Sequence, residues 1–164
     1  MKVKDEFIAL VNKHEGILQK ICNIYFFRNP YKEDYYQEIL IRLWKAYPGF
    51  RNQSKFSTWL YRVALNTAID IIRKQSLRPR YTEISKFEYN IPESESNTES
   101  DQKEKLYQAI NHLSDIDKAI ILLHLEELSY QEIGEIIGIS EGNAGVRIGR
   151  IKHQLFKILE NGKP

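Results

Sequence analysis

The sequence holds a single cysteine, Cys22, so no disulfide bond can form within its 164 residues. Leu18, Ile21 and Tyr25 surround this cysteine at helical spacing, which predicts a buried and unreactive thiol. Of the four histidines, none lies at metal-ligand spacing from another histidine or from the cysteine. The sequence therefore predicts neither a disulfide framework nor a metal site.

Long apolar runs and nucleotide-binding loops are also missing. No stretch approaches the ~20 apolar residues that a membrane-spanning helix needs, and residues 1–8 carry charges of both signs in place of a signal-peptide core. No glycine-rich loop precedes a lysine followed by serine or threonine. Asp34 and Glu38 lie one turn apart on a face that we expect to be exposed, which argues against a catalytic pair. We expect a cytoplasmic protein that is not an enzyme, with no cofactor, no small-molecule substrate and no direct membrane insertion.

Positive charge is only slightly in excess, with 24 Lys and Arg against 22 Asp and Glu and a formal net charge of +2. A chain with this balance is not a uniformly basic nucleic-acid coat, so any affinity for nucleic acid has to come from local patches. The content of 42% hydrophobic and 28% charged residues is ordinary for a soluble protein of one or two small domains.

Three amphipathic helices are predicted in the first half of the chain. Apolar residues recur at three- and four-residue steps over residues 5–25, 31–47 and 56–74. A polar and basic loop, residues 50–55, joins the last two. These helices predict an all-α domain over residues 1–75. Two interpretations of its polar face stay open: a solvated helical hairpin, or a nucleic-acid surface in which basic and aromatic residues alternate.

Residues 76–103 have the composition of a tether. Pro79 and Pro92 interrupt any helix, and residues 92–101 are acidic and polar without an apolar side chain. Such a stretch cannot bury enough surface to fold by itself. We predict a flexible acidic linker that lets the domains on either side reorient freely and that proteases cut first.

Helical periodicity returns over residues 104–164 and predicts a second small domain. Ser114 and Ser129, each followed by an acidic residue three positions on, have the spacing of capping boxes. Gly138 ends the short helix that Ser129 opens, and Ser140 opens the last helix. Two helices joined by so short a turn are typical of a helix-turn-helix, with a generic helical hairpin as the alternative.

The last helix separates a buried stripe from a face that we expect to point at DNA. At ~100° per residue, Val146 and Arg150 lie opposite the stripe, and Arg147 lies on its flank. We expect Arg150 to contact a base edge or a phosphate and Val146 a thymine methyl group. For Arg147 we expect either a phosphate contact or an internal pair with Glu132 or Glu135.

Glycine recurs on one side of this helix, at Gly142, Gly145 and Gly149. Each glycine costs about 1 kcal/mol of helix propensity, so the pattern needs a reason. Close approach of the helix backbone to DNA is one explanation, and a kinked or frayed helix start is the other.

The first half of the chain resembles a known family at specific residues. Asp34, Gln37 and Glu38, followed by Arg-Leu-Trp at residues 42–44, look like the polymerase-binding region of bacterial RNA polymerase sigma factors. Residues 50–73, with Thr-Trp-Leu at 58–60, look like the region that reads and melts the upstream edge of the transcription bubble. The second half resembles the sigma-factor domain that reads the upstream promoter element, from Leu-Ser-Tyr-Gln-Glu-Ile at 128–133 onward.

Two departures from the family pattern are present. The family often has proline where this chain has Ser114, and commonly a basic residue where it has Gly145. Two domains without a third between them are similar to the small extracytoplasmic-function (ECF) group. The resemblance implies a subunit that recruits core polymerase, docking on its β′ clamp, that binds promoter DNA at the −10 and −35 elements, and that an anti-sigma factor holds inactive.

The resemblance also implies three sets of site residues, each named by its place in this chain. Core polymerase is expected to bind Asp34, Gln37, Glu38, Ile41 and Arg42, where Ile41 stands apolar on a polar face. The −10 region is expected to bind Phe50, Arg51, Asn52, Gln53, Ser54, Lys55, Trp59, Arg62 and Asn66. The −35 region is expected to bind Ser140, Glu141, Gly142, Asn143, Val146, Arg147, Arg150 and His153.

Two functions from other classes compete with this one. A stand-alone regulator would use only the helix-turn-helix on DNA, its first half serving for dimerisation or sensing. A pure protein-interaction module would touch DNA with neither half. Co-purification with core polymerase separates the first function from both rivals.

Overall fold

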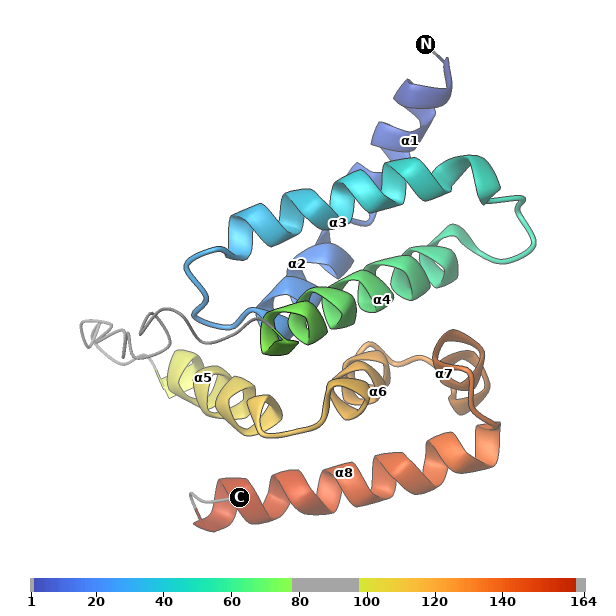
Figure 1. The fold of residues 1–164 in the computed structure, drawn as a ribbon. Helices are drawn as coiled ribbons and strands as arrows, with labels where there is room; N and C mark the ends of the chain where they lie inside the picture. Colours follow the sequence, from blue (N-terminus) through green and yellow to red (C-terminus); the bar gives the residue numbers. More distant parts are fainter. Residues whose placement is uncertain (1, 78–97, 162–164) are drawn as a thin grey trace.

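The computed structural model describes residues 2–77 and 98–161, and within these ranges the chain forms helices without a strand (Figure 1). The N-terminal half holds α1 (Lys2–Lys13), α2 (Glu15–Tyr25), α3 (Lys32–Ala46), a 3₁₀ turn η1 (Tyr47–Gly49) and α4 (Phe56–Leu77). The C-terminal half holds α5 (Thr98–Asn111), α6 (Asp115–Leu125), α7 (Tyr130–Ile137) and α8 (Glu141–Asn161). The all-α prediction is confirmed, while most of the predicted linker lies outside the described residues.

The prediction of one helix over residues 5–25 is wrong, because the chain breaks at His14 into α1 and α2. The Nδ1 atom of His14 lies 2.8 Å from the carbonyl oxygen of Leu10. The backbone here bonds over three residues instead of four, from His14 N to Val11 O and from Ile17 N to His14 O, both at 3.0 Å. A side chain that bonds into the helix ladder is a recognised cause of a break.

Helices α3 and α4 form the centre of the N-terminal half. Ile39 and Leu43 of α3 and Leu60 and Ala64 of α4 have no exposed surface, and they repeat at the three- and four-residue steps that the sequence shows. Cys22 of α2 lies in the same core, and burial raises the pKa of its thiol to about 11. The thiol is therefore buried and protonated at neutral pH, as predicted.

Helix α5 begins at Thr98, six residues before the expected start near residue 104, and α4 continues to Leu77. The early start has an electrostatic reason. Glu99 and Asp101 lie in the first turn of α5, where negative side chains favour the positive end of the helix dipole. The last residues of the acidic run, 98–101, therefore form the first turn of a helix.

The capping box predicted at Ser129 is confirmed, whereas Ser114 is an N-cap without the reciprocal bond of a capping box. Ser129 accepts from Glu132 N at 3.1 Å while the Glu132 carboxylate accepts from Ser129 N at 2.8 Å, which is a complete capping box. The Ser114 hydroxyl accepts from Asp117 N at 3.2 Å. Gly138 has φ of +88° and ends α7 in the left-handed conformation that glycine adopts without strain.

The two halves pack against each other, in contrast to the predicted free reorientation. Figure 1 shows α4 between α3 and the row of α5, α6 and α7, with α8 on the far side of that row. Contacts of α2 with α5 and α6, and of α4 with α7, join the halves. Within the described residues no helix is long and apolar enough to cross a bilayer, and no cluster of acidic, histidine or cysteine residues is arranged to hold a metal.

Candidate nucleic-acid interface

The outer face of α3 presents apolar side chains beside acidic and amide ones. Asp34, Gln37 and Ile41 are exposed, and Ile41 leaves 52% of its surface open. Trp44, one turn further, is 42% exposed while its ring packs 5.1 Å from Phe7 of α1. Trp44 is not among the predicted site residues, although its spacing of three from Ile41 places both on one face. This face has the composition of a protein-docking surface.

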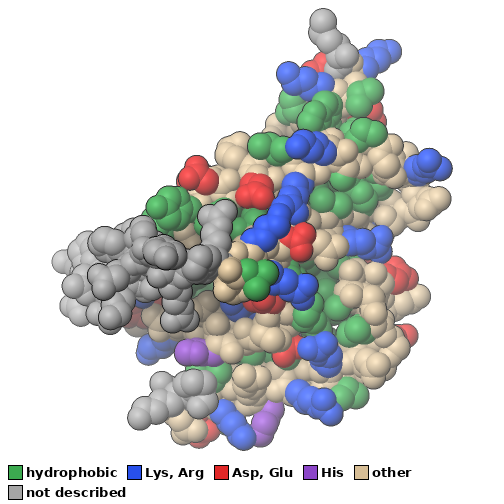
Figure 2. Space-filling view, in the orientation of Figure 1, with side chains coloured by type: hydrophobic (Ala, Val, Ile, Leu, Met, Phe, Trp, Pro, Cys, Tyr) green, Lys and Arg blue, Asp and Glu red, His purple; other side chains and the backbone are tan. Residues whose placement is uncertain are grey.

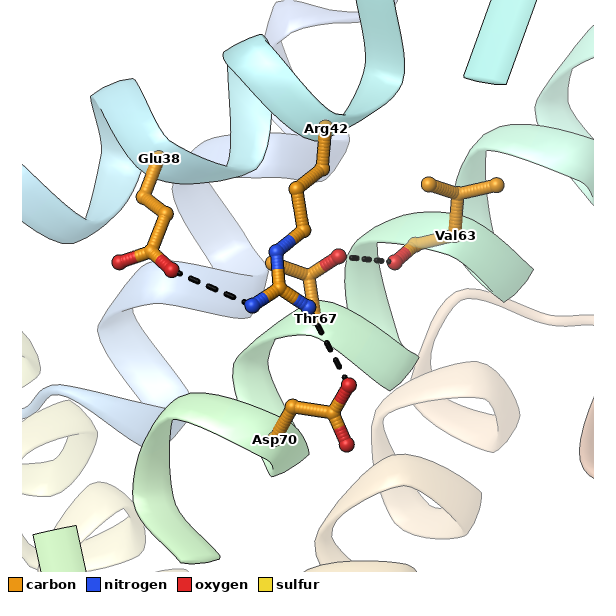
Figure 3. A network of polar contacts seen from close by, with 5 residues as sticks. All are labelled: Glu38, Arg42, Val63, Thr67 and Asp70. Carbon is orange, nitrogen blue, oxygen red and sulfur yellow. Dashed lines mark hydrogen bonds and ion pairs between the residues drawn. The ribbon is translucent and has the colours of Figure 1, made fainter. Parts of the chain in front are cut away.

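Arg42 does not share that outward position. Its guanidinium turns toward α4, where Nη1 lies 3.2 Å from Asp70 Oδ2, and Nη2 lies 3.3 Å from Glu38 Oε1 (Figure 3). The same close-up shows the Thr67 hydroxyl donating to the Val63 carbonyl at 2.7 Å. Arg42 therefore links α3 to α4. It was predicted to contact polymerase together with Asp34 and Ile41, but its guanidinium turns away from their face and toward α4.

An open groove of about 440 Å³ runs between α3 and α4 beside this network. Its walls are Lys45 and Ala46 from α3 and Val63 and Asn66 from α4, with Arg42 and Asp70 along it. A groove with cations, one amide and an apolar wall suits a nucleobase joined to a phosphate. Asn66 was predicted to take part, whereas Lys45 and Asp70 were not, because helical periodicity says nothing about which exposed residues of two helices meet.

The loop between η1 and α4 rests on an aromatic base. The ring of Phe50 lies 5.2 Å from Trp59 and 5.7 Å from Phe56, and the backbone N–H of Phe50 donates to Tyr47 O at 2.9 Å. Asn52, at φ of +56°, forms the bend. Beyond Phe50 the loop side chains are all exposed: Arg51, Asn52, Gln53, Ser54 and Lys55. The predicted loop residues therefore form one surface, in which the aromatic ring is an anchor.

Exposed residues of α4 continue this surface from the loop. Trp59 is half-buried, and Arg62 and Asn66 follow at helical spacing with exposed side chains. The guanidinium of Arg62 donates from Nη2 to the carbonyl oxygen of Glu135 on α7 at 3.1 Å. On the face drawn in Figure 2, lysine and arginine side chains are interspersed with acidic ones and form no continuous basic area. The exposed basic residues of the loop and of the adjoining face of α4 are Arg51, Lys55 and Arg62.

Helix α8 divides as the sequence predicts. Ala144, Ile148 and Ile151 are buried against the rest of the half. Val146 keeps 55% of its surface exposed. The other predicted −35 residues that are exposed are Ser140, Glu141, Gly142, Asn143, Arg150 and His153. The Ser140 hydroxyl accepts from Asn143 N at 3.1 Å and fixes the first turn.

Arg147 is the exception on this helix. Its Nη2 atom lies 2.8 Å from Asp117 Oδ1 on α6, and the pair is half-buried. An internal pair was one of the two expectations, but the expected partners, Glu132 and Glu135, were wrong. Asp117 lies in the first turn of α6, which packs along α8. Arg147 thus orients α8 on its own half.

The three glycines of α8 have different surroundings. A Cβ atom at Gly145 would lie 3.2 Å from the ring of Tyr130, so this glycine leaves room for the tyrosine. Gly142 and Gly149 have open space at the Cβ position. Packing therefore explains Gly145 and does not explain the other two, which leave the exposed face of the helix bare.

A second groove, of about 310 Å³, lies on the C-terminal half between α5, α6 and α8. Leu106, Leu125, Phe156 and Leu159 line it, and Phe156 is 63% exposed. Burial, followed by the charge of Lys152, lowers the pKa of His124 at its edge. Helical periodicity does not predict this apolar groove, since Phe156 and Leu159 fall outside the regular stripe of α8.

Comparison with known proteins accounts for both halves. Residues 10–78 match Sigma-70 region 2, and residues 103–155 match Sigma-70, region 4. The ECF RNA polymerase sigma-E factor of Haemophilus influenzae is 31% identical over 93% of this chain and 86% of its own length. The ECF RNA polymerase sigma factor SigW of Bacillus subtilis is 32% identical over 96% of this chain and 91% of its own length.

Solved structures share the fold. The sigma factor RpoE in complex with the anti-sigma factor NepR, from Bartonella quintana, has a TM-score of 0.69 at 20% identity, covering 94% of this chain and 97% of its own. CnrH in complex with the cytosolic domain of CnrY has a TM-score of 0.69 at 19% identity, covering 96% and 90%. Region 2 precedes region 4 in this chain, and both relatives match it along nearly its whole length. The chain belongs to the sigma-70 family of RNA polymerase sigma factors, in the ECF group.

Proposed function

We propose that this protein binds core RNA polymerase in the bacterial cytoplasm and directs it to promoters, without catalysing a reaction itself. In this function α3 docks on polymerase, the groove and loop around α4 hold the −10 element, and α8 reads the −35 element. The observation that carries the proposal is the exposure of Ile41 and Trp44 beside Asp34 on α3, together with a fully capped helix-turn-helix. A stand-alone regulator does not need exposed apolar side chains beside an acidic one on α3.

Polymerase docking is expected to depend on the acidic part of the α3 face. Asp34→Lys should weaken binding to core polymerase about tenfold, because a like charge would face the partner's contact surface, whereas Glu38→Lys would also break the Glu38–Arg42 pair. Asp34 makes no ion pair with a described residue, so its reversal should leave the melting temperature nearly unchanged. A pull-down titration with core polymerase checks this. Glu160→Lys, on an exposed residue near the end of α8, is the matched control, and equal affinity of both variants would contradict the assignment.

Capture of an unpaired base is the function proposed for the groove between α3 and α4. Unstacking a base costs a few kcal/mol, which contacts in the groove have to offset. Asn66 offers both a donor and an acceptor to a base edge, and Lys45 offers a charge to the backbone phosphate. Val63 and Ala46 provide the apolar wall. The Arg42–Asp70 pair holds the two helices at the separation that leaves this groove open.

Close approach of α8 to DNA is the function proposed for its bare glycines. Gly149→Ala should stabilise the protein by about 0.8–1 kcal/mol, because it removes a glycine from the interior of an exposed helix. The same methyl group should weaken promoter binding if the helix backbone lies against the groove. Thermal melting measures the expected gain in stability, and duplex binding measures the expected loss of affinity for DNA. A variant that is more stable and binds equally well would show that the bare face has no role in DNA approach.

An anti-sigma protein is the proposed inhibitor. Of the similar structures described above, RpoE was solved with the anti-sigma factor NepR, and CnrH with the cytosolic domain of CnrY. The apolar groove of the C-terminal half, with Leu125 and Phe156 exposed, provides a surface that an apolar helix of a partner protein fits.

Run-off transcription tests the proposed function directly. Purified core polymerase with a library of promoter fragments should produce specific transcripts only when this protein is added. Co-purification with core polymerase separates this function from the stand-alone regulator and from a pure interaction module. If the protein neither binds core polymerase nor directs initiation, the proposal fails.

A further inference from the structure

Six aromatic rings form a continuous cluster that reaches from α1 to the start of α4. They come from α1, the end of α3, η1, the loop of residues 50–55 and the first turn of α4: Phe7, Trp44, Tyr47, Phe50, Phe56 and Trp59. The rings in contact have centroids 5.1–6.5 Å apart, within the range in which aromatic pairs attract each other. This aromatic cluster connects the N-terminal helix to the loop proposed to hold the −10 strand.

Two rings of the cluster bound the exposed part of this loop. Phe50 comes directly before residues 51–55 and Phe56 directly after them, and their ring centroids lie 5.7 Å apart at an interplanar angle of 81°. The side chains in between are all exposed, so they contribute little packing of their own. The two ends of the loop are therefore held together by an aromatic pair.

Tyr47 contacts the rings on both sides of the loop. Its ring centroid lies 6.3 Å from Phe50, 6.5 Å from Phe56 and 6.1 Å from Trp59. Its carbonyl oxygen accepts the backbone N–H of Phe50 at 2.9 Å, while its own N–H donates to Leu43 O in the last turn of α3. One residue thus fixes the ends of the loop relative to α3 and α4.

Phe7 holds the Tyr47 ring from another helix. Phe7 keeps only 7% of its surface exposed, and its ring lies 5.1 Å from Tyr47 and 5.1 Å from Trp44. Figure 1 shows α1 projecting from the other helices beside the end of α3. Phe7 also precedes residues 10–78, the range that matches Sigma-70 region 2. The first half of α1 thus adds a support for the loop that lies outside the matched region.

We infer that Tyr47 is a positioning residue for the −10 strand: its ring holds residues 51–55 in the shape that receives the strand, and Phe7 of α1 holds that ring in place. The inference rests on the proposed role of this loop in strand binding. A loop that is already ordered binds more tightly than a mobile one, because it has less backbone entropy left to lose on binding.

Tyr47→Ala removes the ring that Phe50 and Phe56 share as a neighbour, and should weaken strand binding about three- to tenfold. Tyr47→Phe keeps the ring and should bind as the wild type does. Fluorescence anisotropy measures binding of a labelled single-stranded DNA of randomised sequence to the holoenzyme that each variant forms with purified core polymerase. Core polymerase alone gives the baseline. Equal affinity of the Tyr47→Ala and wild-type holoenzymes would overturn the inference.

A stability control separates positioning of the loop from general loss of structure. Leu18 of α2 has no exposed surface and lies outside the aromatic cluster. Leu18→Ala leaves a cavity in the core and should lower the melting temperature at least as much as Tyr47→Ala does. At a temperature where both variants are folded, Leu18→Ala should leave strand affinity unchanged. An equal loss of strand affinity in the two variants would assign the effect to stability and overturn the inference.

The role of α1 is tested by a double-mutant cycle. Phe7→Ala should weaken strand binding less than Tyr47→Ala, because it leaves the Tyr47 ring present but less well held. If Phe7 acts through Tyr47, the double variant should bind as Tyr47→Ala alone does. Multiplication of the two separate losses in the double variant would show that Phe7 acts independently, and would overturn this part of the inference.

Trypsin cleavage reports on the loop itself, since Arg51 and Lys55 are exposed within it. Cleavage after these two residues should be faster in Tyr47→Ala than in Leu18→Ala, because a loosened loop fits a protease more readily. Weaker strand binding at an unchanged cleavage rate would overturn the inference and leave the proposed function intact. Absence of strand binding by the wild-type holoenzyme above the core baseline would remove the proposed −10 function, and the inference with it.

Discussion

Arg150→Ala is expected to weaken binding to the upstream promoter element by about 1–3 kcal/mol, a loss of roughly 5- to 150-fold. Arg150 is exposed on α8, opposite the buried Ile148 and Ile151, and makes no ion pair with a described residue. Arg147, which is nearer in sequence to the helix start, is occupied by Asp117. Arg150 is therefore the arginine of this helix that is available to DNA.

Selectivity and salt dependence tell base contact from phosphate contact. A bidentate contact with a base edge predicts relaxed selectivity at one position of the element. A phosphate contact predicts a uniform loss across sequences and a salt slope smaller by about one unit. Lys157→Ala, which removes one charge further along α8, is the matched control for the general effect of charge. Duplex binding over a salt series and a panel of upstream sequences measures both quantities.

Val146 provides the complementary variant. Its exposed methyl groups suit contact with a thymine methyl group, so Val146→Asn should change which upstream sequence is preferred with little change in salt slope. If neither Arg150→Ala nor Val146→Asn changes affinity, selectivity or salt slope, α8 does not read the element and the C-terminal assignment is wrong.

Local chemistry is what the sequence predicted well. The capping box of Ser129 and Glu132, the left-handed Gly138 and the buried stripe of α8 all depend on residues within four positions of one another. Such patterns are visible in sequence because both partners appear in the same short window. The break at His14 was missed because the amphipathic stripe continues through it on both sides.

Contacts between distant residues were beyond sequence reasoning. Periodicity put Arg42 on the polar face of its helix, but only the packing of α3 on α4 turns it toward Asp70, 28 positions away. The pairing of Arg62 with the end of α7 spans 73 positions, and the acidic residues before Lys103 gave no sign that they begin a helix. Charge and spacing identify which residues are polar, whereas tertiary packing decides which of them stay available to a partner.

The turn of the helix-turn-helix explains why position 134 has to be small. A Cβ atom there would lie 2.5 Å from the carbonyl oxygen of Ile139 and 3.5 Å from Glu141 N, both backbone atoms of the turn into α8. The Gly134 carbonyl also accepts from Gly138 N at 2.8 Å and from Ile139 N at 3.0 Å. The chain therefore folds back directly over this residue, and no flexible side chain is present to move aside.

Gly134→Val is expected to destabilise the protein by about 3 kcal/mol, the upper part of the range for overpacked sites. For a chain of this length the loss corresponds to a fall in melting temperature of roughly 6–12 °C. Gly149→Val introduces the same side chain into α8, where open space surrounds the Cβ position, and should change stability by less than about 0.5 kcal/mol. Thermal melting followed by circular dichroism compares the two. Equal melting temperatures would show that the turn moves away from α7 without cost.

Promoter binding by the Gly134→Val protein should also fall, because a displaced turn shifts the start of α8, where Ser140 and Asn143 fix its first residues.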